Sequence, residues 1–265
     1  MAPKRRRSIA FFFQNWQKLR DDAGMPKCPV CFSIEGEEDF GDLQNISIMR
    51  DYGLAAIQLH HDHPTRYFDP FSGLTDDGIA LLEKVEQESL LLDLSHLSGA
   101  LLSHVLNKHY AQKIVSHVVC ADIQTPSPFA RANALTKTEL VNCNAILYGM
   151  PFLDDLISFS AYLKCVDRKV GIGAVSKHII AVAQEVGVER VALGPDYFEY
   201  KLISDSVSNS QNIEVDTVKG LETTEGLNEL AKELRQDGLD DSEIDAVFWG
   251  NASEVLTPYL KIWND

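Results

Sequence analysis

The sequence predicts a protein of the α/β class, in which a parallel sheet is covered by helices. Short apolar segments alternate along the chain with longer segments whose apolar residues recur with the helical period of about 3.6. The short segments are apolar at successive positions, and a strand that is apolar on both faces belongs in a parallel sheet with helices outside it. The 265 residues, 45% of them apolar and 24% charged, fit one large domain over residues 1–265.

Six strands are expected from continuous apolar runs bounded by turn residues or by the ends of helices. Eight such strands would close a barrel. The predicted strands cover residues 28–34, 54–59, 90–94, 113–116, 145–148 and 190–193.

Helices are expected between and after these strands. The first, over 8–22, is amphipathic and ends before Pro26, and the helix over 76–88 begins with Asp76 and Asp77, carboxylates that are favoured in a first helical turn. The other predicted helices cover residues 42–51, 98–110, 137–142, 154–166, 174–186, 227–236, 242–249 and 252–263.

Three segments lie outside this alternation. Residues 1–24 form an amino-terminal helical segment, and residues 226–265 form a group of carboxyl-terminal helices. Residues 197–225 are rich in Ser, Asn and Asp and follow the last strand, so we expect a long loop that covers the site.

Ionisable side chains follow five of the six predicted strands. Ligands bind at the carboxyl ends of strands in parallel α/β folds, because the loops and the helix amino termini converge there. We therefore expect a functional site built from strand ends. The residues at these ends are Glu35, His60, His61, Asp93, His96, His117 and Asp196.

Some of these residues also have a purely structural explanation. Glu35 lies in an acidic run and would cap the next helix, and His96 would start a helix with Ser95 or Ser98 as its cap. His117 is open to a similar explanation.

The other histidines are weaker candidates. Neighbouring residues of a loop point in different directions, so at most one or two histidines of the cluster at 60–63 can reach a common metal. We assign only His61 to the site, as a substrate contact. His104, His109 and His178 fall on predicted helices, where surface or packing roles are expected.

Charge and cysteine content limit the partners and the compartment. Thirty-nine acidic and 24 basic residues give a net charge of −15, so nucleic acid is not an expected partner. No run approaches the roughly 18 apolar residues of a membrane span. The five cysteines are an odd number in a chain too large to need a disulfide framework, which favours a reducing compartment and predicts a cytoplasmic protein. The basic residues at 4–7 precede too short an apolar run for a secretory signal.

Six short motifs occur in order along the chain. They are Ser33-Ile-Glu-Gly36, Gly73-Leu-Thr-Asp-Asp-Gly78, Leu92-Asp-Leu-Ser-His-Leu-Ser98, Val115-Ser-His117, Leu193-Gly-Pro-Asp196 and Gly250-Asn251. As an ordered set, they resemble the membrane (renal) dipeptidase family of zinc peptidases, within the amidohydrolase superfamily. The resemblance runs from about residue 15 to residue 260.

The resemblance implies a TIM-barrel-like parallel sheet with outer helices that binds two zinc ions and hydrolyses dipeptides, including those with a D-residue at the carboxyl side. Glu35 resembles the carboxylate that bridges the metals, and His96 and His117 resemble the two imidazoles of one metal site. Asp196 resembles the acid-base aspartate. His61 resembles the histidine that stabilises the tetrahedral intermediate.

Two features differ from the family pattern. The family begins with a strand that ends in H-x-D and holds the other metal, but no H-x-D precedes Glu35. We therefore expect an amino-terminally shortened barrel that lacks its first two strands and binds one zinc ion. Arg131, the expected contact for the substrate carboxylate, is displaced by one position from the family's arginine.

The expected function is metal-dependent hydrolysis of dipeptides or related small amides by a zinc-activated water. The alternative is a catalytically inactive barrel remnant that acts as a scaffold or binding module. An incomplete barrel leaves strand edges that must be covered. We expect the amino-terminal segment to cover them or to form the contact of a homodimer.

Overall fold

The computed structural model describes residues 31–35, 42–51, 53–59, 65–69, 73–97, 99–107, 112–120, 134–151, 171–195, 218, 220–221 and 224–260. The chain divides into two compact units. Unit 1 comprises Met1–Leu92 and Leu256–Asp265, and unit 2 comprises Asp93–Val255. The predicted helices over 8–22 and 154–166 and most of the predicted loop over 197–225 lie outside the described residues.

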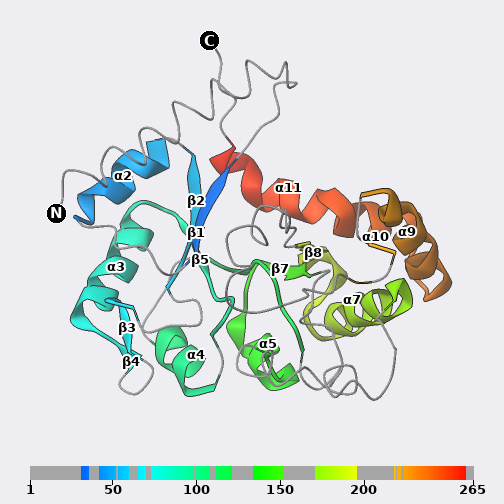
Figure 1. The fold of residues 1–265 in the computed structure, drawn as a ribbon, viewed down its shortest axis with the longest axis horizontal. Helices are drawn as coiled ribbons and strands as arrows, with labels where there is room; N and C mark the ends of the chain where they lie inside the picture. Colours follow the sequence, from blue (N-terminus) through cyan, green and yellow to red (C-terminus); the bar gives the residue numbers. More distant parts are fainter. Residues whose placement is uncertain are drawn as a thin grey trace, which may run out of the picture. The chain divides into compact units, whose positions relative to one another are not determined.

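The strands form a mostly parallel sheet, as predicted (Figure 1). Hydrogen bonding orders them β1-β2-β5-β6-β7-β8, and the pairs β1 with β2, β6 with β7 and β7 with β8 are each parallel. The strands are β1 (Phe32–Glu35), β2 (Leu54–Gln58), β5 (Leu91–Asp93), β6 (Lys113–Val115), β7 (Leu147–Met150) and β8 (Val191–Leu193). All five residues of β2 and all four of β7 are buried, so both faces of these strands are covered.

Unit 1 contains the helices α2 (Gln44–Asp51) and α3 (Asp76–Gln87) between its strands. The Thr75 hydroxyl caps α3 by accepting a hydrogen bond from the backbone N–H of Gly78 at 3.0 Å. A short antiparallel hairpin of β3 (Phe68–Asp69) and β4 (Gly73–Leu74) precedes this helix. The sequence did not predict the hairpin, because strands of two residues are too short to show a period.

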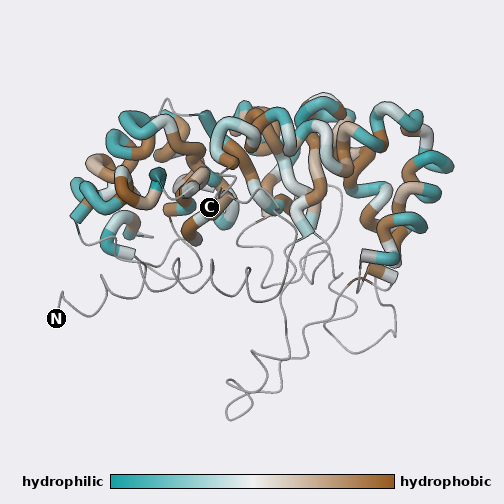
Figure 2. Tube along the Cα trace, turned by 90° about the horizontal axis from the view of Figure 1, so that it is seen from above, coloured by the Kyte–Doolittle hydropathy of each residue, from teal (hydrophilic) through white to brown (hydrophobic). Residues whose placement is uncertain are grey.

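Unit 2 contains most of the outer helices. Figure 2 shows apolar and hydrophilic residues alternating along the helical turns, as expected for helices with one buried face. The helices that begin in this unit are α4 (Gly99–Leu106), α5 (Lys137–Cys143), α7 (Ile172–Val186), α9 (Leu227–Gln236), α10 (Asp241–Asp245) and α11 (Asn251–Leu256). A π-helical turn, Ala246–Gly250, connects α10 to α11.

The buried side chain of Asn251 ties α11 to the start of β8. Its Nδ2 donates to the backbone oxygens of Val188 and Val191, both at 2.8 Å. Asn251 therefore supplies a donor to two carbonyls where the chain enters the last strand.

Strand β7 begins two residues later than the sequence predicted, at Leu147. Asn144 ends α5 with a φ of 43°, and the backbone N–H of Ala145 donates to the hydroxyl of Tyr148 at 3.0 Å. That hydroxyl in turn donates to the backbone oxygen of Leu140 at 2.8 Å. Ala145 is therefore engaged in the helix-to-strand turn and does not join the sheet.

None of the described helices is both long enough and apolar enough to cross a membrane.

Candidate functional site

The structure brings His96 and His117 together in unit 2. Their Nε2 atoms lie 2.9 Å apart, and their ring centroids are 4.9 Å apart at an interplanar angle of 71°. His96 follows β5 and His117 follows β6, so both imidazoles come from loops at the carboxyl ends of strands. These positions agree with the prediction that both histidines lie at the carboxyl ends of strands.

A tight turn after β5 positions His96. Asp93 is buried, and its Oδ1 accepts from the backbone N–H of Ser95 at 3.0 Å, which closes an Asx-type turn. The backbone N–H of Leu97 then donates to the oxygen of Leu94 at 3.1 Å. His96 adopts a φ of 64° inside this turn, in the left-handed region that favours glycine.

A cluster of hydrogen bonds holds the residues after β6. Ser116 Oγ lies 3.0 Å from Nδ1 of His117 and 3.1 Å from Oγ of Ser95. The backbone N–H of His117 donates to Ser95 Oγ at 3.2 Å, and that of Ser116 donates to Asp93 Oδ1 at 3.0 Å. Ser95 Oγ itself donates to Asp93 Oδ1 at 2.7 Å. The loops after β5 and β6 are therefore locked to each other through Asp93.

Two glycines bring the neighbouring backbone against Ser116. A Cβ added to Gly149 would lie 1.8 Å from the backbone oxygen of Ser116, and one added to Gly194 would lie 2.0 Å from the same atom. Only glycine fits this close approach, which fixes the position of the loop that carries His117.

The Nε2 atoms of His96 and His117 are slightly closer together than a shared zinc ion would need. Nitrogen ligands of a tetrahedral zinc, each about 2.0–2.1 Å from the ion, lie about 3.3 Å apart. The 2.9 Å between the Nε2 atoms of His96 and His117 is close to this value. Among the described residues, no group of three His, Cys, Asp or Glu side chains is placed to hold a metal.

The remaining candidates lie partly or wholly outside the described residues. The backbone of Glu35 ends β1, in register with Gln58 of β2, but its side chain is not described. His61, Arg131 and Asp196 are outside the described ranges, so their predicted roles stay predictions.

Sequence reasoning noted Asp93 at a strand end and Ser95 as a helix cap, and it missed Ser116. The structure connects all three to His117. The signal that could have found them is the run of short polar side chains beside each histidine, because serine and aspartate readily bond to nearby backbone and side chains.

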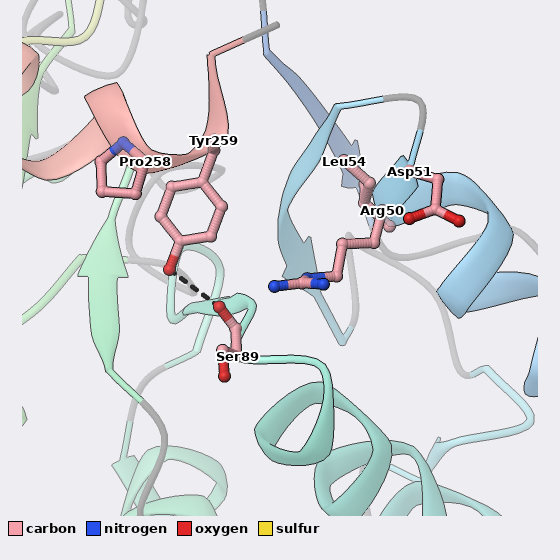
Figure 3. A pocket seen from close by; sticks show the side chains of 6 residues that line it. All are labelled: Arg50, Asp51, Leu54, Ser89, Pro258 and Tyr259. Carbon is pink, nitrogen blue, oxygen red and sulfur yellow. Dashed lines mark hydrogen bonds between the residues drawn. The ribbon is translucent and has the colours of Figure 1, made fainter.

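A cavity of about 200 Å³ lies in unit 1 (Figure 3). The described residues around it include Arg50, Leu54, Pro258 and Tyr259, and the Tyr259 hydroxyl donates to the backbone oxygen of Ser89 at 2.9 Å. Leu54 begins β2 and Ser89 precedes β5, so the cavity adjoins the amino ends of these strands. His96 and His117 do not line it, and we assign the site from the histidine pair.

Comparison with known proteins identifies a matching family. The model of the membrane dipeptidase family (peptidase family M19) matches residues 4–261.

Two curated relatives are dipeptidases. Dipeptidase verJ of Clonostachys rogersoniana is 26% identical over 236 residues, which cover 84% of this chain and 54% of the relative. Dipeptidase aclJ of Aspergillus oryzae is 25% identical over 237 residues, which cover 84% of this chain and 50% of the relative. The chain therefore spans about half the length of the curated relatives it matches.

Solved structures resemble this chain in fold over most of its length. A metallo peptidase from Rhodobacter sphaeroides, bound to a phosphinate mimic of the dipeptide L-Ala-D-Ala, gives a TM-score of 0.69 at 19% identity and covers 88% of this chain and 63% of its own. An amidohydrolase from Pseudomonas aeruginosa gives a TM-score of 0.69 at 14% identity and covers 86% of this chain and 71% of its own. These likenesses confirm the predicted α/β, TIM-barrel-like fold.

Proposed function

Because the chain belongs to the membrane dipeptidase family, we propose that it hydrolyses dipeptides or related small amides with a metal-activated water. The observation that carries this proposal is the pair of imidazole Nε2 atoms 2.9 Å apart at two neighbouring strand ends. The two nitrogens face each other at hydrogen-bonding distance, and a metal ion shared by the two rings would require the same facing arrangement.

His96 and His117 would hold one zinc ion, with Glu35 as the third ligand. Three protein ligands and one open position are the usual arrangement of a catalytic zinc. A zinc ion bound there supplies a Lewis acid and lowers the pKa of a coordinated water toward neutrality.

The chain's other residues would bind substrate and move protons. Asp196 takes the proton from the attacking water and returns it to the leaving amine, as a general base and then a general acid. His61 donates a hydrogen bond to the developing oxyanion, and Arg131 binds the substrate carboxylate as an ion pair. The role of Asp196 rests on a motif that the chain shares with its family, and the roles of His61 and Arg131 rest on the resemblance to that family, from whose arginine Arg131 is displaced by one position.

The test measures metal content and hydrolysis together. We expect the full chain, dialysed with zinc, to retain about one zinc ion per molecule and to cleave a small dipeptide. The bound ligand of the Rhodobacter sphaeroides structure makes L-Ala-D-Ala the first substrate to assay. Mass spectrometry of the metal and release of free alanine are the two measurements.

Matched variants separate ligation from proton transfer. His96→Ala should abolish zinc retention, because only one imidazole would remain. Asp196→Asn should retain zinc and lose turnover, because its proposed role is proton transfer. His104→Ala is the control, since His104 lies on the helix α4 and is not among the residues assigned to the site. A wild-type chain that holds no zinc and cleaves nothing would contradict the proposal and favour the scaffold alternative.

A further inference from the structure

We propose that Asp93 determines, through the hydroxyls of Ser95 and Ser116, which nitrogen of His117 carries the proton. The proton is held on Nδ1, so Nε2 presents its lone pair toward His96. The inference rests on the proposed function, because a bare Nε2 is what a metal ligand requires. It is also a property of the protein without metal, and this makes it testable separately.

Asp93 determines which group donates in the first of the linked hydrogen bonds that lead to His117. Its side chain is 3% exposed, and Oδ1 accepts three hydrogen bonds, from Ser95 N, Ser95 Oγ and Ser116 N. An ionised carboxylate can only accept, so the single proton of the Ser95 hydroxyl is committed to Asp93.

The Ser95 hydroxyl must then accept every other bond that it makes. A hydroxyl has one proton and two acceptor positions. The backbone N–H of His117 occupies one acceptor position at 3.2 Å, and Ser116 Oγ occupies the other at 3.1 Å. The Ser116 hydroxyl is therefore the donor of the Ser95–Ser116 contact.

The same count decides the contact to the imidazole. The one proton of Ser116 is used on Ser95, so its 3.0 Å contact with Nδ1 of His117 requires that Nδ1 donate. A neutral imidazole has one N–H, and Nε2 is then bare. The 2.9 Å contact between the rings is consistent with this direction, with Nε2 of His96 as the donor in the absence of metal.

Ser95 and Ser116 are thus positioning residues for His117, and Asp93 acts through them. Partners of this kind, one step removed from the metal, commonly change metal affinity by about 10–100-fold when they are removed. The site would gain a pre-set ligand without placing a carboxylate in contact with the imidazole ring.

The first test reads the tautomer in the unmodified, metal-free full chain. Histidine labelled with ¹⁵N distinguishes protonated from bare ring nitrogens by chemical shift, and His117→Gln identifies the His117 signals by their loss. At mildly alkaline pH we expect His117 to show a protonated Nδ1 and a bare Nε2. A protonated Nε2 would overturn the inference, and the tautomer itself is read in the unmodified protein.

The second test removes one hydroxyl at a time. In Ser116→Ala, Nδ1 loses its acceptor. In Ser95→Ala, the Ser116 hydroxyl is free to turn its proton toward Nδ1, so the tautomer should move to Nε2–H although Ser116 is still present. Both variants should bind zinc about 10–100-fold more weakly in competition titrations.

The matched control is Ser176→Ala on α7, which removes another hydroxyl-to-carboxylate hydrogen bond, to Asp237 at 2.7 Å. It should change neither the His117 shifts nor the zinc affinity. A Ser95→Ala protein that keeps the wild-type His117 shifts would overturn the relay. Failure of the wild type to bind zinc would sink the proposed function alone, because the metal-free spectrum still decides the tautomer.

Discussion

His117 and His178 lie in the same unit and show opposite ways of placing an imidazole in a protein. His117 is half-buried, and both of its ring nitrogens have a partner within 3.0 Å. His178, on α7, is 1% exposed, and neither ring nitrogen makes a hydrogen bond. The first ring is oriented by polar contacts, and the second is packed as an apolar group would be.

The role of each histidine therefore depends on its surroundings and not on its residue type. Burial lowers the pKa of His178 to about 4. The nearby backbone of Val118 raises this pKa by a smaller amount, although its contact with the ring does not meet the criteria for a hydrogen bond. His178 is therefore neutral at physiological pH and belongs to the core. His117 is held so that one nitrogen faces a second imidazole, which is of use to a metal.

The largest effect is expected from Gly149→Ala, which disturbs only the His117 side of this comparison. The new Cβ would lie 1.8 Å from the backbone oxygen of Ser116, so the loop that carries His117 must move. We expect a loss of at least about 3 kcal/mol in the free energy of unfolding, together with loss of zinc binding. Urea denaturation and zinc titration measure the two.

The control for this variant is Gly173→Ala on α7. A Cβ there meets its nearest side chain at 3.6 Å, which is ordinary van der Waals contact. The control should be neutral or stabilising by about 0.5–1 kcal/mol, because alanine is the better helix former. Equal stability of the two variants would show that the close approach at Ser116 is unimportant.

His178→Leu should make the stability of the protein less dependent on pH. The pKa of His178 is about 4 in the folded protein and 6.5 in the unfolded chain, so the unfolded chain takes up the proton first as the pH falls. The protein loses about 3 kcal/mol of stability from this residue between pH 6.5 and 4, and about 2 kcal/mol of it by pH 5.

The leucine variant cannot lose this part of the stability, because leucine takes up no proton. Urea denaturation near pH 7.5 and pH 5 should show a smaller drop for His178→Leu than for the wild type. His104→Leu is the control and should keep the wild-type drop. The same drop in all three proteins would refute the buried, neutral state of His178.

Asn251→Leu, by contrast, should lower the free energy of unfolding by about 2 kcal/mol. Asn251 is a buried polar residue with partners, and leucine would remove the donor from the Val188 and Val191 carbonyls. His178→Leu removes a buried polar group that has no hydrogen bond, so at neutral pH it should not destabilise. Asn142→Leu, on the exposed surface of α5, should stay within about 0.5 kcal/mol of the wild type. Thermal denaturation measures the stability of the three variants. A destabilised His178→Leu together with an unaffected Asn251→Leu would contradict the expectation that only the hydrogen-bonded residue contributes to stability.

Much of the fold could be predicted from the sequence, because apolar runs and helical periods extend over enough residues to be seen. The strands β2, β5, β6 and β8 and the helices α3 and α9 lie within one residue of their predicted bounds. The family and the α/β class were predicted correctly. The β3–β4 hairpin and the late start of β7 were not, because they depend on turns and on the bonds of one tyrosine hydroxyl.

The candidate site could be predicted only in part. The rule that strand ends carry chemistry placed His96 and His117 in one region, and the structure has them 2.9 Å apart. That rule carries no information about proton direction. The roles of Ser95 and Ser116 follow from counting donors and acceptors at known distances, which no linear pattern contains.

At His96, whose backbone is left-handed, selection for stability and selection for metal binding favour different residues. A φ of 64° disfavours most residues other than glycine by roughly 1 kcal/mol or more, so His96→Gly should relieve strain while it removes an imidazole. Laboratory evolution for heat resistance alone should therefore collect glycine or asparagine at position 96. Selection for metal retention should restore the histidine at the same position. The residue at position 96 would then indicate whether a lineage was selected for heat resistance or for metal retention.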